Sequence, residues 1–277
     1  MKRAASPVRR YCGNFVLLVV ACFALGPVAL LLENSLKPHE AIVRNPLEPP
    51  RSLDFANFTT AWTEGHFTTG LLNSLLLCAA TVAITLSAAV LAAYPLARSR
   101  ARGIRLLALL FLCSVTVPIQ LFLFPLYFVF AHFNLIGNVF ATAVILAAIN
   151  LPLAIFLLRT YIMTIPTELD DAGLMDGAGP FQVFWYIIFP LTRPGLVTVA
   201  ALVCLNVWNE YLVTSTFQQG ENHFTMTLGY LAMNGSISAD QGLLMAGGVL
   251  VIVPILLVFM GTRRFIIGGL TAGAVKG

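Results

Sequence analysis

Residues 166–190 read PTELDDAGLMDGAGPFQVFWYIIFP and form a long, acidic interruption in the second half of a very apolar chain. The stretch contains four of the twelve acidic residues of the chain: Glu168, Asp170, Asp171 and Asp176. On both sides lie hydrophobic runs that are long enough to cross a bilayer. Because a connection between two membrane spans does not need this length and acidity, we expect a partner in the aqueous phase to recognise it.

The first half of this stretch predicts a short helix that ends in a turn. Pro166 is typical of a first helical turn, and Thr167 is a residue that can cap a helix. Asp170 follows Thr167 by three residues, as the acidic member of a capping box does. Gly177 can adopt a left-handed conformation without a Cβ clash, so the turn is expected there.

The second half predicts another helix, from Gly179-Pro180 to Pro190. Its aromatic and aliphatic residues form one apolar stripe at helical spacing: Phe181, Phe184, Trp185 and Ile188. An amphipathic helix anchored at lipid headgroups is the alternative to a helix that docks on a protein. Headgroup-anchored helices usually carry Lys and Arg on their polar face. None occurs between Arg159 and Arg193, which favours protein docking.

The composition is that of a membrane protein. Charged residues make up 10% of the 277 residues, whereas a soluble domain contains about 25%. The sequence contains no phosphate-binding loop and no zinc-protease or serine-hydrolase motif. Its five cysteines and four histidines lack the spacing of metal ligands. We therefore expect no catalytic, cofactor-binding or metal site, and no partner that is a nucleic acid.

The apolar runs predict an all-α integral membrane protein whose residues 1–277 form a single domain with six transmembrane helices. The expected spans are about residues 15–33, 70–96, 106–131, 138–158, 195–217 and 243–262. Pro118 and Pro125 should bend or break the third span, because proline donates no backbone hydrogen bond. The outer connection before the second span is expected to contain a short helix near residues 55–63.

The distribution of basic residues predicts the orientation. With six spans, thirteen of the sixteen Lys and Arg residues fall on the side of the two termini. Only Lys37, Arg44 and Arg51 fall on the opposite side. Since short cytoplasmic segments are enriched in Lys and Arg, both termini and residues 166–190 are expected to face the cytoplasm.

Polar residues inside the apolar runs are candidates for a translocation path. Asn206, Asn209 and Glu210 have the spacing of one helix face in the fifth span. Polar groups in membranes serve both structure and transport, so both roles stay open for them. Gln120 and Asn150 are weaker candidates. No Lys or Arg is expected at membrane depth, which favours a neutral solute.

Asp171-Ala172-Gly173, Gly177 and the run Ile187-x-Phe189-Pro190 resemble the EAA loop of ATP-binding-cassette importer permeases. The family pattern has Glu-Ala-Ala, then Gly after three residues, then Ile-x-Leu-Pro after nine more. This chain differs by Asp for Glu, Gly for the second Ala and Phe for Leu. The resemblance is to the maltose-type inner-membrane subunits of the carbohydrate-uptake branch. It covers the whole chain through an ordered set of short matches, at residues 53–58, 73–74, 93–98, 125–127, 175–178, 208–212 and 269–277.

The resemblance implies a permease that couples to a separate ATPase through the cytoplasmic loop. The implied coupling residues are Glu168, Asp170, Asp171, Ala172, Gly173, Met175, Asp176, Gly177, Ala178 and Phe181. The connection before the last span would contact a binding protein through Thr225, Met226, Leu228, Gly229, Met233, Asn234 and Gly235. The tail residues Lys276 and Gly277 would lie at the ATPase interface.

The implied assembly is an ATP-driven sugar importer in the cytoplasmic (inner) membrane of a prokaryote. Its partners would be a homologous second permease, two ATP-binding-cassette ATPase subunits and an extracytoplasmic solute-binding protein. ATP and Mg would bind in the ATPase, with no cofactor in this chain. A secondary transporter driven by an ion gradient is the alternative, with Glu210 as its one candidate for an intramembrane acid. A membrane-embedded enzyme ranks last, and the sequence does not identify the sugar.

Overall fold

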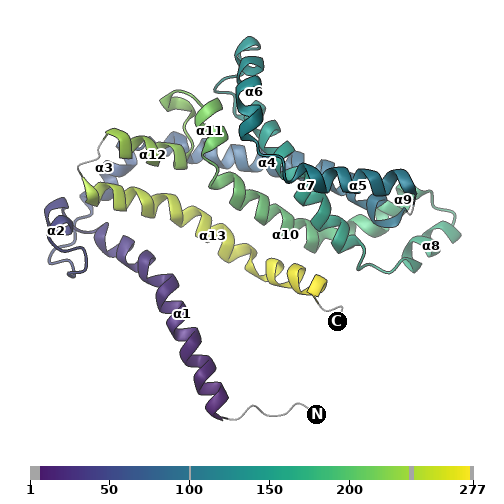
Figure 1. Ribbon diagram of the computed structural model, residues 1–277, viewed down its shortest axis with the longest axis horizontal. Helices are drawn as coiled ribbons and strands as arrows, with labels where there is room; N and C mark the ends of the chain where they lie inside the picture. Colours follow the sequence, from purple (N-terminus) through teal and green to yellow (C-terminus); the bar gives the residue numbers. More distant parts are fainter. Residues whose placement is uncertain (1–6, 100, 237–239, 275–277) are drawn as a thin grey trace. The chain divides into compact units, whose positions relative to one another are not determined.

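The computed structural model describes residues 7–99, 101–236 and 240–274, and in these ranges every regular element is a helix (Figure 1). The chain divides into two compact units. The first contains Met1–Gly65 and Tyr230–Ile252, and the second contains His66–Gly229 and Val253–Gly277. The predicted tail residues Lys276 and Gly277 lie outside the described ranges.

Five helical segments in the described ranges are long and apolar enough to cross a membrane. They are Gly13–Asn34 in α1 (Pro7–Asn34), Phe67–Arg98 (α4), Val139–Ile162 (α7), the run Pro180–Trp208, and Gln241–Arg263 in α13 (Gln241–Ala274). The expected all-helical fold is thereby confirmed in the described ranges, with several helices that could span a membrane. The expected short helix near residues 55–63 is also present, as α3 (Ala56–Glu64).

The predicted third span is not one helix, which corrects the boundaries 106–131. It consists of α5 (Arg102–Ser114) and α6 (Gln120–His132), each of only 13 residues. The break between them contains Pro118, which has no N–H and disfavours helical geometry in the residue before it. Pro125 lies inside α6 without ending it. The two prolines therefore act differently, and only Pro118 coincides with a break.

The predicted fifth span also has different boundaries. The helix starts at Pro180 and ends at Trp208, rather than covering residues 195–217. The last part of the predicted span forms a separate short helix, α11 (Leu212–Phe217). The connection that follows contains two short helices, η2 (Glu221–His223) and α12 (Met226–Ser236).

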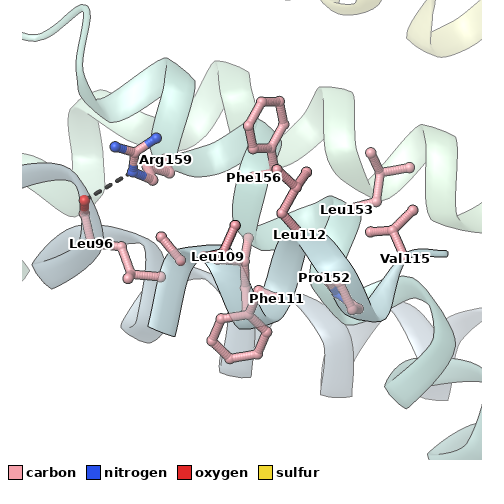
Figure 2. A pocket seen from close by; sticks show the side chains of 11 residues that line it. Leu96, Leu109, Phe111, Leu112, Val115, Pro152, Leu153, Phe156 and Arg159 are labelled. Carbon is pink, nitrogen blue, oxygen red and sulfur yellow. Dashed lines mark hydrogen bonds between the residues drawn. The ribbon is translucent and has the colours of Figure 1, made fainter. Parts of the chain in front are cut away.

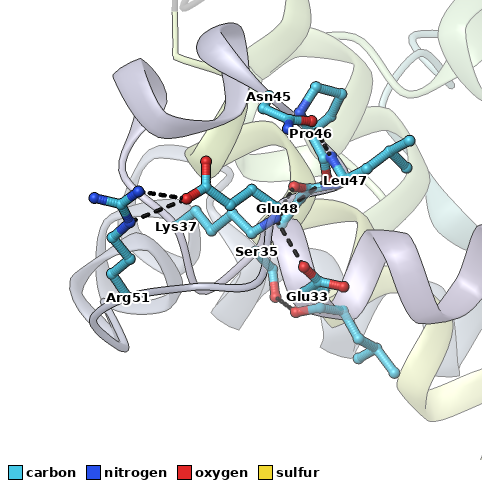
Figure 3. Close-up of polar contacts among 10 residues, drawn as sticks. Glu33, Ser35, Lys37, Asn45, Pro46, Leu47, Glu48 and Arg51 are labelled. Atoms are coloured by element: carbon cyan, nitrogen blue, oxygen red, sulfur yellow. Dashed lines mark hydrogen bonds and ion pairs between the residues drawn. The ribbon is translucent and has the colours of Figure 1, made fainter.

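In the first unit, Lys37 fixes the end of α1 to the segment that follows it. Its side chain is only 2% exposed, and its Nζ lies 2.9 Å from Asn34 Oδ1, 3.1 Å from the Pro46 carbonyl oxygen and 2.9 Å from Glu33 Oε1 (Figure 3). Two of these contacts are hydrogen bonds, to Asn34 and Pro46, and the third is an ion pair with Glu33. The buried charge is therefore fully paired, as burial of a charge requires.

Replacing Lys37 by methionine should destabilise the first unit. Methionine fills similar space, but it leaves the Pro46 carbonyl and the Asn34 amide without their donor, at a cost of about 1–3 kcal/mol for each buried group left unsatisfied. We expect a lower unfolding temperature for the purified protein in detergent. Arg51→Met is the matched control, because among the described residues the partner of Arg51 is Glu48, and the Arg51 side chain is 85% exposed. Equal melting temperatures for the two variants would contradict this role of Lys37.

The core of the second unit is formed by α4, α7 and α10 (Phe189–Trp208). Small side chains are buried where these helices meet, which allows their backbones to approach closely. Ala89, Ala93 and Ala154 are at most 1% exposed. At Gly195 an added Cβ would lie 2.8 Å from the Tyr161 ring, so only glycine fits against that ring.

Candidate functional site

The candidate coupling site is the helix α8 (Glu168–Met175) together with the turn and the short helix α9 (Pro180–Val183) that follow it. Gly177 has a φ of +84°, a left-handed conformation that confirms the predicted turn. The Ala178 N–H donates to the Gly173 carbonyl oxygen at 3.1 Å, and the Gly177 N–H donates to that of Leu174 at 3.1 Å. This pair of bonds is the Schellman motif, which closes the C-terminus of α8 in a fixed geometry.

The N-terminus of α8 is not built as the sequence suggested. Thr167 has helical angles, φ −69° and ψ −22°, and its side chain makes no capping bond. Asp170 does not cap either, because its carboxylate points to residues of α4. The capping-box prediction for Thr167 and Asp170 is therefore wrong. The reason is that an ion pair between helices holds the acid more strongly than a local backbone N–H would.

Asp170 connects α8 to the end of α4. Its Oδ1 accepts a hydrogen bond from the Tyr94 hydroxyl at 2.7 Å, and its Oδ2 lies 2.9 Å from Arg98 Nη2. Arg98 Nη1 also donates to the Ile165 carbonyl oxygen at 3.1 Å, just before α8. Both side chains of the ion pair are 14% exposed. Charge-assisted bonds are stronger where water is largely excluded, so α8 and α4 are held together at this point. We call Tyr94, Arg98 and Asp170 the α4–α8 clamp.

A second contact holds α8 against the helix that follows. Gly173 is buried, and a Cβ there would lie 2.9 Å from both Val183 Cγ2 and Ile187 Cδ1. These two side chains therefore occupy the place that an alanine methyl group would take. Gly173 therefore allows α8 to approach the following helix more closely than an alanine would.

The predicted second helix does not end at Pro190. It continues through a π-helical turn, Phe184–Ile188, directly into α10, and the Phe189 N–H donates to the Phe184 carbonyl oxygen. Pro190, which has no N–H to donate, directly follows this π-helical turn and lies inside the continuous helix. π turns inside α-helices are frequent at functional sites. The candidate coupling site is thus continuous with the helical run Pro180–Trp208, which is long and apolar enough to cross a membrane.

The predicted apolar stripe is divided between two environments. Phe184 and Ile188 are buried, and the Phe184 ring lies 5.2 Å from the Tyr94 ring. Phe181 is 70% exposed, and Trp185 stays partly exposed beside it. One half of the stripe therefore packs against the clamp, and the other half remains on the surface.

The outward side of α8 and its turn is an exposed surface with apolar and acidic members. Met175 is 87% exposed and Leu174 is 49% exposed. Of the predicted coupling residues, Glu168, Asp171, Ala172, Met175, Asp176, Gly177 and Phe181 are exposed, Asp170 and Ala178 are half-buried, and Gly173 is buried. An apolar surface with an acidic rim has the composition of a protein-docking site.

The predicted binding-protein contacts lie in and before α12, and most of their side chains point into the chain itself. Thr225, Met226, Leu228, Gly229 and Met233 are buried, whereas Asn234 and Gly235 are exposed. The Met226 N–H donates to the Ser74 hydroxyl at 2.9 Å, within the second unit. Of these seven residues, Asn234 and Gly235 are the ones that a partner can reach directly.

The candidate path residues do not share one helix face. α10 ends at Trp208, so Asn209 and Glu210 follow the helix that contains Asn206. Both Glu210 oxygens accept backbone N–H bonds at the start of α11, from Val213 at 2.8 Å and Thr214 at 2.9 Å. The single-face interpretation is therefore wrong, because the three-residue break at 209–211 turns the chain. Glu210 has a structural role here.

Asn150 and Asn206 are brought together by α7 and α10. Asn206 Nδ2 donates to Asn150 Oδ1 at 3.2 Å, and Asn150 Nδ2 donates to the Leu146 carbonyl oxygen at 2.8 Å. Asn150 is 9% exposed and Asn206 is exposed, so the pair reaches from the core to the surface. Gln120 is exposed at the start of α6.

The sequence did not predict the clamp partners Tyr94 and Arg98 as site residues. Tyr94 and Asp170 are 76 residues apart in the sequence, and only the fold brings them together. Charge was the one sequence feature that could have indicated this contact. Arg98 ends a predicted span on the same predicted side of the membrane as the acidic residues 166–190.

The comparisons identify relatives along the whole chain. A family model described as "Binding-protein-dependent transport system inner membrane component" matches residues 85–267. An arabinooligosaccharides transport system permease protein of Halalkalibacterium halodurans is 32% identical over 100% of both chains. A melibiose/raffinose/stachyose import permease protein of Bacillus subtilis is 29% identical, with 94% of each chain covered.

A diacetylchitobiose uptake system permease protein of Streptomyces coelicolor is 28% identical, covering 99% of this chain and 92% of the relative. In structure, the chain is similar to a bacterial ABC transporter involved in the import of the acidic polysaccharide alginate. The TM-score is 0.75 with 22% identity, over 95% of this chain and 99% of that chain, and this likeness shows a shared fold. The chain belongs to the family of binding-protein-dependent transport system inner membrane components, as a permease subunit of an ABC transporter.

Proposed function

We propose that this chain is a permease subunit of an ATP-driven importer of sugars or oligosaccharides in a prokaryotic inner membrane. The observation that carries the sugar assignment is similarity over almost the full length to permeases named for arabinooligosaccharides, diacetylchitobiose and melibiose. None of the comparisons supports a transporter driven by an ion gradient. Glu210, the one acid that this alternative required, bonds to two backbone N–H groups instead.

In the proposed assembly, a second homologous permease completes the translocation path and two ATPase subunits bind ATP and Mg. This chain contributes no catalytic group and no nucleotide site. Residues 1–277 act as one permease domain, a view supported by the family model, which extends across both compact units. The chain crosses the membrane six times, with α5 and α6 together as the third crossing. Both termini lie in the cytoplasm.

The proposed lever for coupling is α8. Its exposed surface, with Met175, Asp171 and Asp176, would enter a cleft of one ATPase subunit. On its other side, Asp170 bonds to Tyr94 and Arg98 at the end of α4. The helix following the turn runs without a break from Pro180 into a membrane span. Closure of the ATPase dimer would therefore move α4 and α10 together with α8. Lys276 and Gly277 would add to the ATPase contact.

On the opposite side of the membrane, α12 would face the solute-binding protein. Asn234 and Gly235 supply the direct contact, because they are exposed. The other five predicted residues would act through the packing of α12. Sugar release would then depend on the position of that helix.

The Asn150–Asn206 pair is the candidate in this chain for a contact with sugar hydroxyls, because amides both donate and accept hydrogen bonds. Asn206→Leu should reduce sugar uptake several-fold, and the measurement is transport of a radiolabelled sugar into proteoliposomes. Ser87→Leu is the control, because Ser87 is an exposed hydroxyl whose bond goes to its own helix. Unchanged uptake with Asn206→Leu would exclude the pair from the path.

The experiment that tests the proposed function is reconstitution with the cognate ATPase, second permease and binding protein. The sugar is found first, by screening the binding protein against arabino-, chito- and galacto-oligosaccharides. We expect uptake that requires ATP and the binding protein and that persists when ion gradients are dissipated. Uptake that follows an ion gradient without ATP would refute the proposal.

A further inference from the structure

A cavity of about 400 Å³ lies in the second unit between α5, α7 and the C-terminal end of α4 (Figure 2). Leucine, phenylalanine and other apolar side chains form its walls, among them Leu109, Leu112, Leu153 and Phe156. Its volume falls within the range of about 300–1,000 Å³ typical of small-molecule sites. Arg159 is the one charged residue among those that line it.

Arg159 is held in place at one end of this cavity. Its Nε donates to the Leu96 carbonyl oxygen at 2.9 Å, as drawn in Figure 2, and the side chain is half-buried. Within the described ranges, no carboxylate pairs with Arg159. Arg98 differs in this respect, because Asp170 neutralises it. The cavity thus combines a long apolar wall with a fixed positive charge for which the described residues supply no counter-charge.

The position of the charge fits the edge of a bilayer. Arg159 lies in the last turn of α7, Arg98 ends α4, and α5 begins at Arg102. Arginine therefore occurs at three neighbouring helix ends: the end of α4, the start of α5 and the end of α7. Basic pockets between transmembrane helices bind anionic lipid headgroups. The apolar wall runs from this edge along α5 and α7, the direction that an acyl chain takes beside transmembrane helices.

We propose that this cavity is a binding site for an anionic phospholipid, with its phosphate on Arg159 and an acyl chain against α5 and α7. This inference goes beyond the proposed transport function and does not depend on the identity of the sugar. A sugar is a poor fit, because such a ligand needs several polar groups and the cavity wall offers one. The guanidinium group suits a phosphate, to which it donates two parallel hydrogen bonds.

The test is native mass spectrometry of the assembled transporter, purified from membranes and then exchanged into nanodiscs. One set of discs contains phosphatidylglycerol and phosphatidylcholine, and the other contains phosphatidylcholine alone. We expect retained phosphatidylglycerol on the wild-type protein and at least about tenfold less on Arg159→Gln, which corresponds to about 1.4 kcal/mol. Arg159→Lys should keep most of it, because the charge remains. Arg193→Gln is the matched control, since Arg193 is exposed and outside the cavity.

A second variant tests the apolar part independently. Ala108 lines the cavity, so Ala108→Trp should fill it and displace the lipid without changing any charge. Equal lipid retention in wild type, Arg159→Gln and Ala108→Trp would overturn the proposal. The proposal would also be overturned if the transporter retained no lipid and the cysteine of Ala108→Cys formed a disulfide or a chemical cross-link with the second permease. That result would show that a protein helix occupies the cavity.

Discussion

Replacing Asp170 by asparagine should lower sugar uptake at least about tenfold, while the permease still inserts and still binds its ATPase. Asparagine has nearly the same size, but it removes the charge that pairs with Arg98 Nη2 at 2.9 Å. The charge also strengthens the bond that the Tyr94 hydroxyl donates to Asp170 Oδ1, since hydrogen bonds to charged groups contribute about 1.5–3 kcal/mol. Loss of one partner also leaves the other charge partly buried and unpaired. We therefore expect α8 to stay docked on the ATPase but to separate from α4.

The consequence for transport is a loss of coupling. ATPase activity of the reconstituted transporter should persist, because the docking surface of α8 is unchanged. Uptake per ATP hydrolysed should fall, and this ratio is the measurement. Tyr94→Phe should produce a smaller loss, because it removes one neutral donor from Asp170 Oδ1 and leaves the ion pair.

The pairwise nature of the clamp can be tested by a double-mutant cycle. Arg98→Gln should lower the uptake ratio as Asp170→Asn does, and the double variant should be no worse than either single variant. Glu64→Gln is the control for loss of a carboxylate, because Glu64 is exposed at the end of α3. If Asp170→Asn transported sugar with the ratio of the wild-type protein, α8 would not act through α4.

Local sequence signals predicted the helices and the turn at 177, because these features depend on neighbours in the chain. Hydrophobic runs of 20 or more residues determine where a helix can span a bilayer. Gly177 is needed wherever φ is positive, and it has a φ of +84°. The family motif identified the same stretch independently.

Helix boundaries around proline were harder to predict. Pro118 coincides with a break, whereas Pro190 directly follows a π turn inside a continuous helix. Pro125 and Pro254 lie inside helices. Every proline lacks a backbone N–H, so a carbonyl in the preceding turn of the helix loses its donor. Neighbouring helices decide whether that carbonyl finds another hydrogen-bond donor, and the sequence alone does not show this. Residues 195–217 were predicted as one span because hydropathy alone does not reveal that the helix ends before residues 209–211.

The clamp was beyond sequence reasoning for a different reason. Asp170 fits a local capping rule, and that rule gave the wrong partner. Two helices had to pack before Tyr94 and Arg98 came within reach of its carboxylate. Glu210 is the opposite case: it was suspected of a transport role, but the bonds that its carboxylate accepts in the described part of the chain come from the nearby start of α11.

Replacing Gly177 by tryptophan should abolish association with the ATPase while the permease remains inserted. A residue with a side chain is strained at φ +84°, at a cost of about 1–2 kcal/mol. An added Cβ there meets no atom within 4 Å, so the indole would project outward from the turn rather than into the chain. It would therefore add bulk at the end of the exposed surface of α8, beside Met175 and Asp176. The measurement is the amount of ATPase that co-purifies with the tagged permease, which we expect to fall at least about tenfold.

Two further variants separate strain from bulk. Gly177→Ala introduces the strain with little volume, so it should keep most of the ATPase while lowering thermal stability slightly. Gly220→Trp is the matched control, because Gly220 also has a positive φ, +90°, and lies in a different connection, before η2. It should bind the ATPase as the wild-type protein does. An unchanged ATPase yield with Gly177→Trp, together with normal uptake, would show that the turn after α8 lies outside the docking surface, since a buried interface does not admit an indole ring without rearrangement.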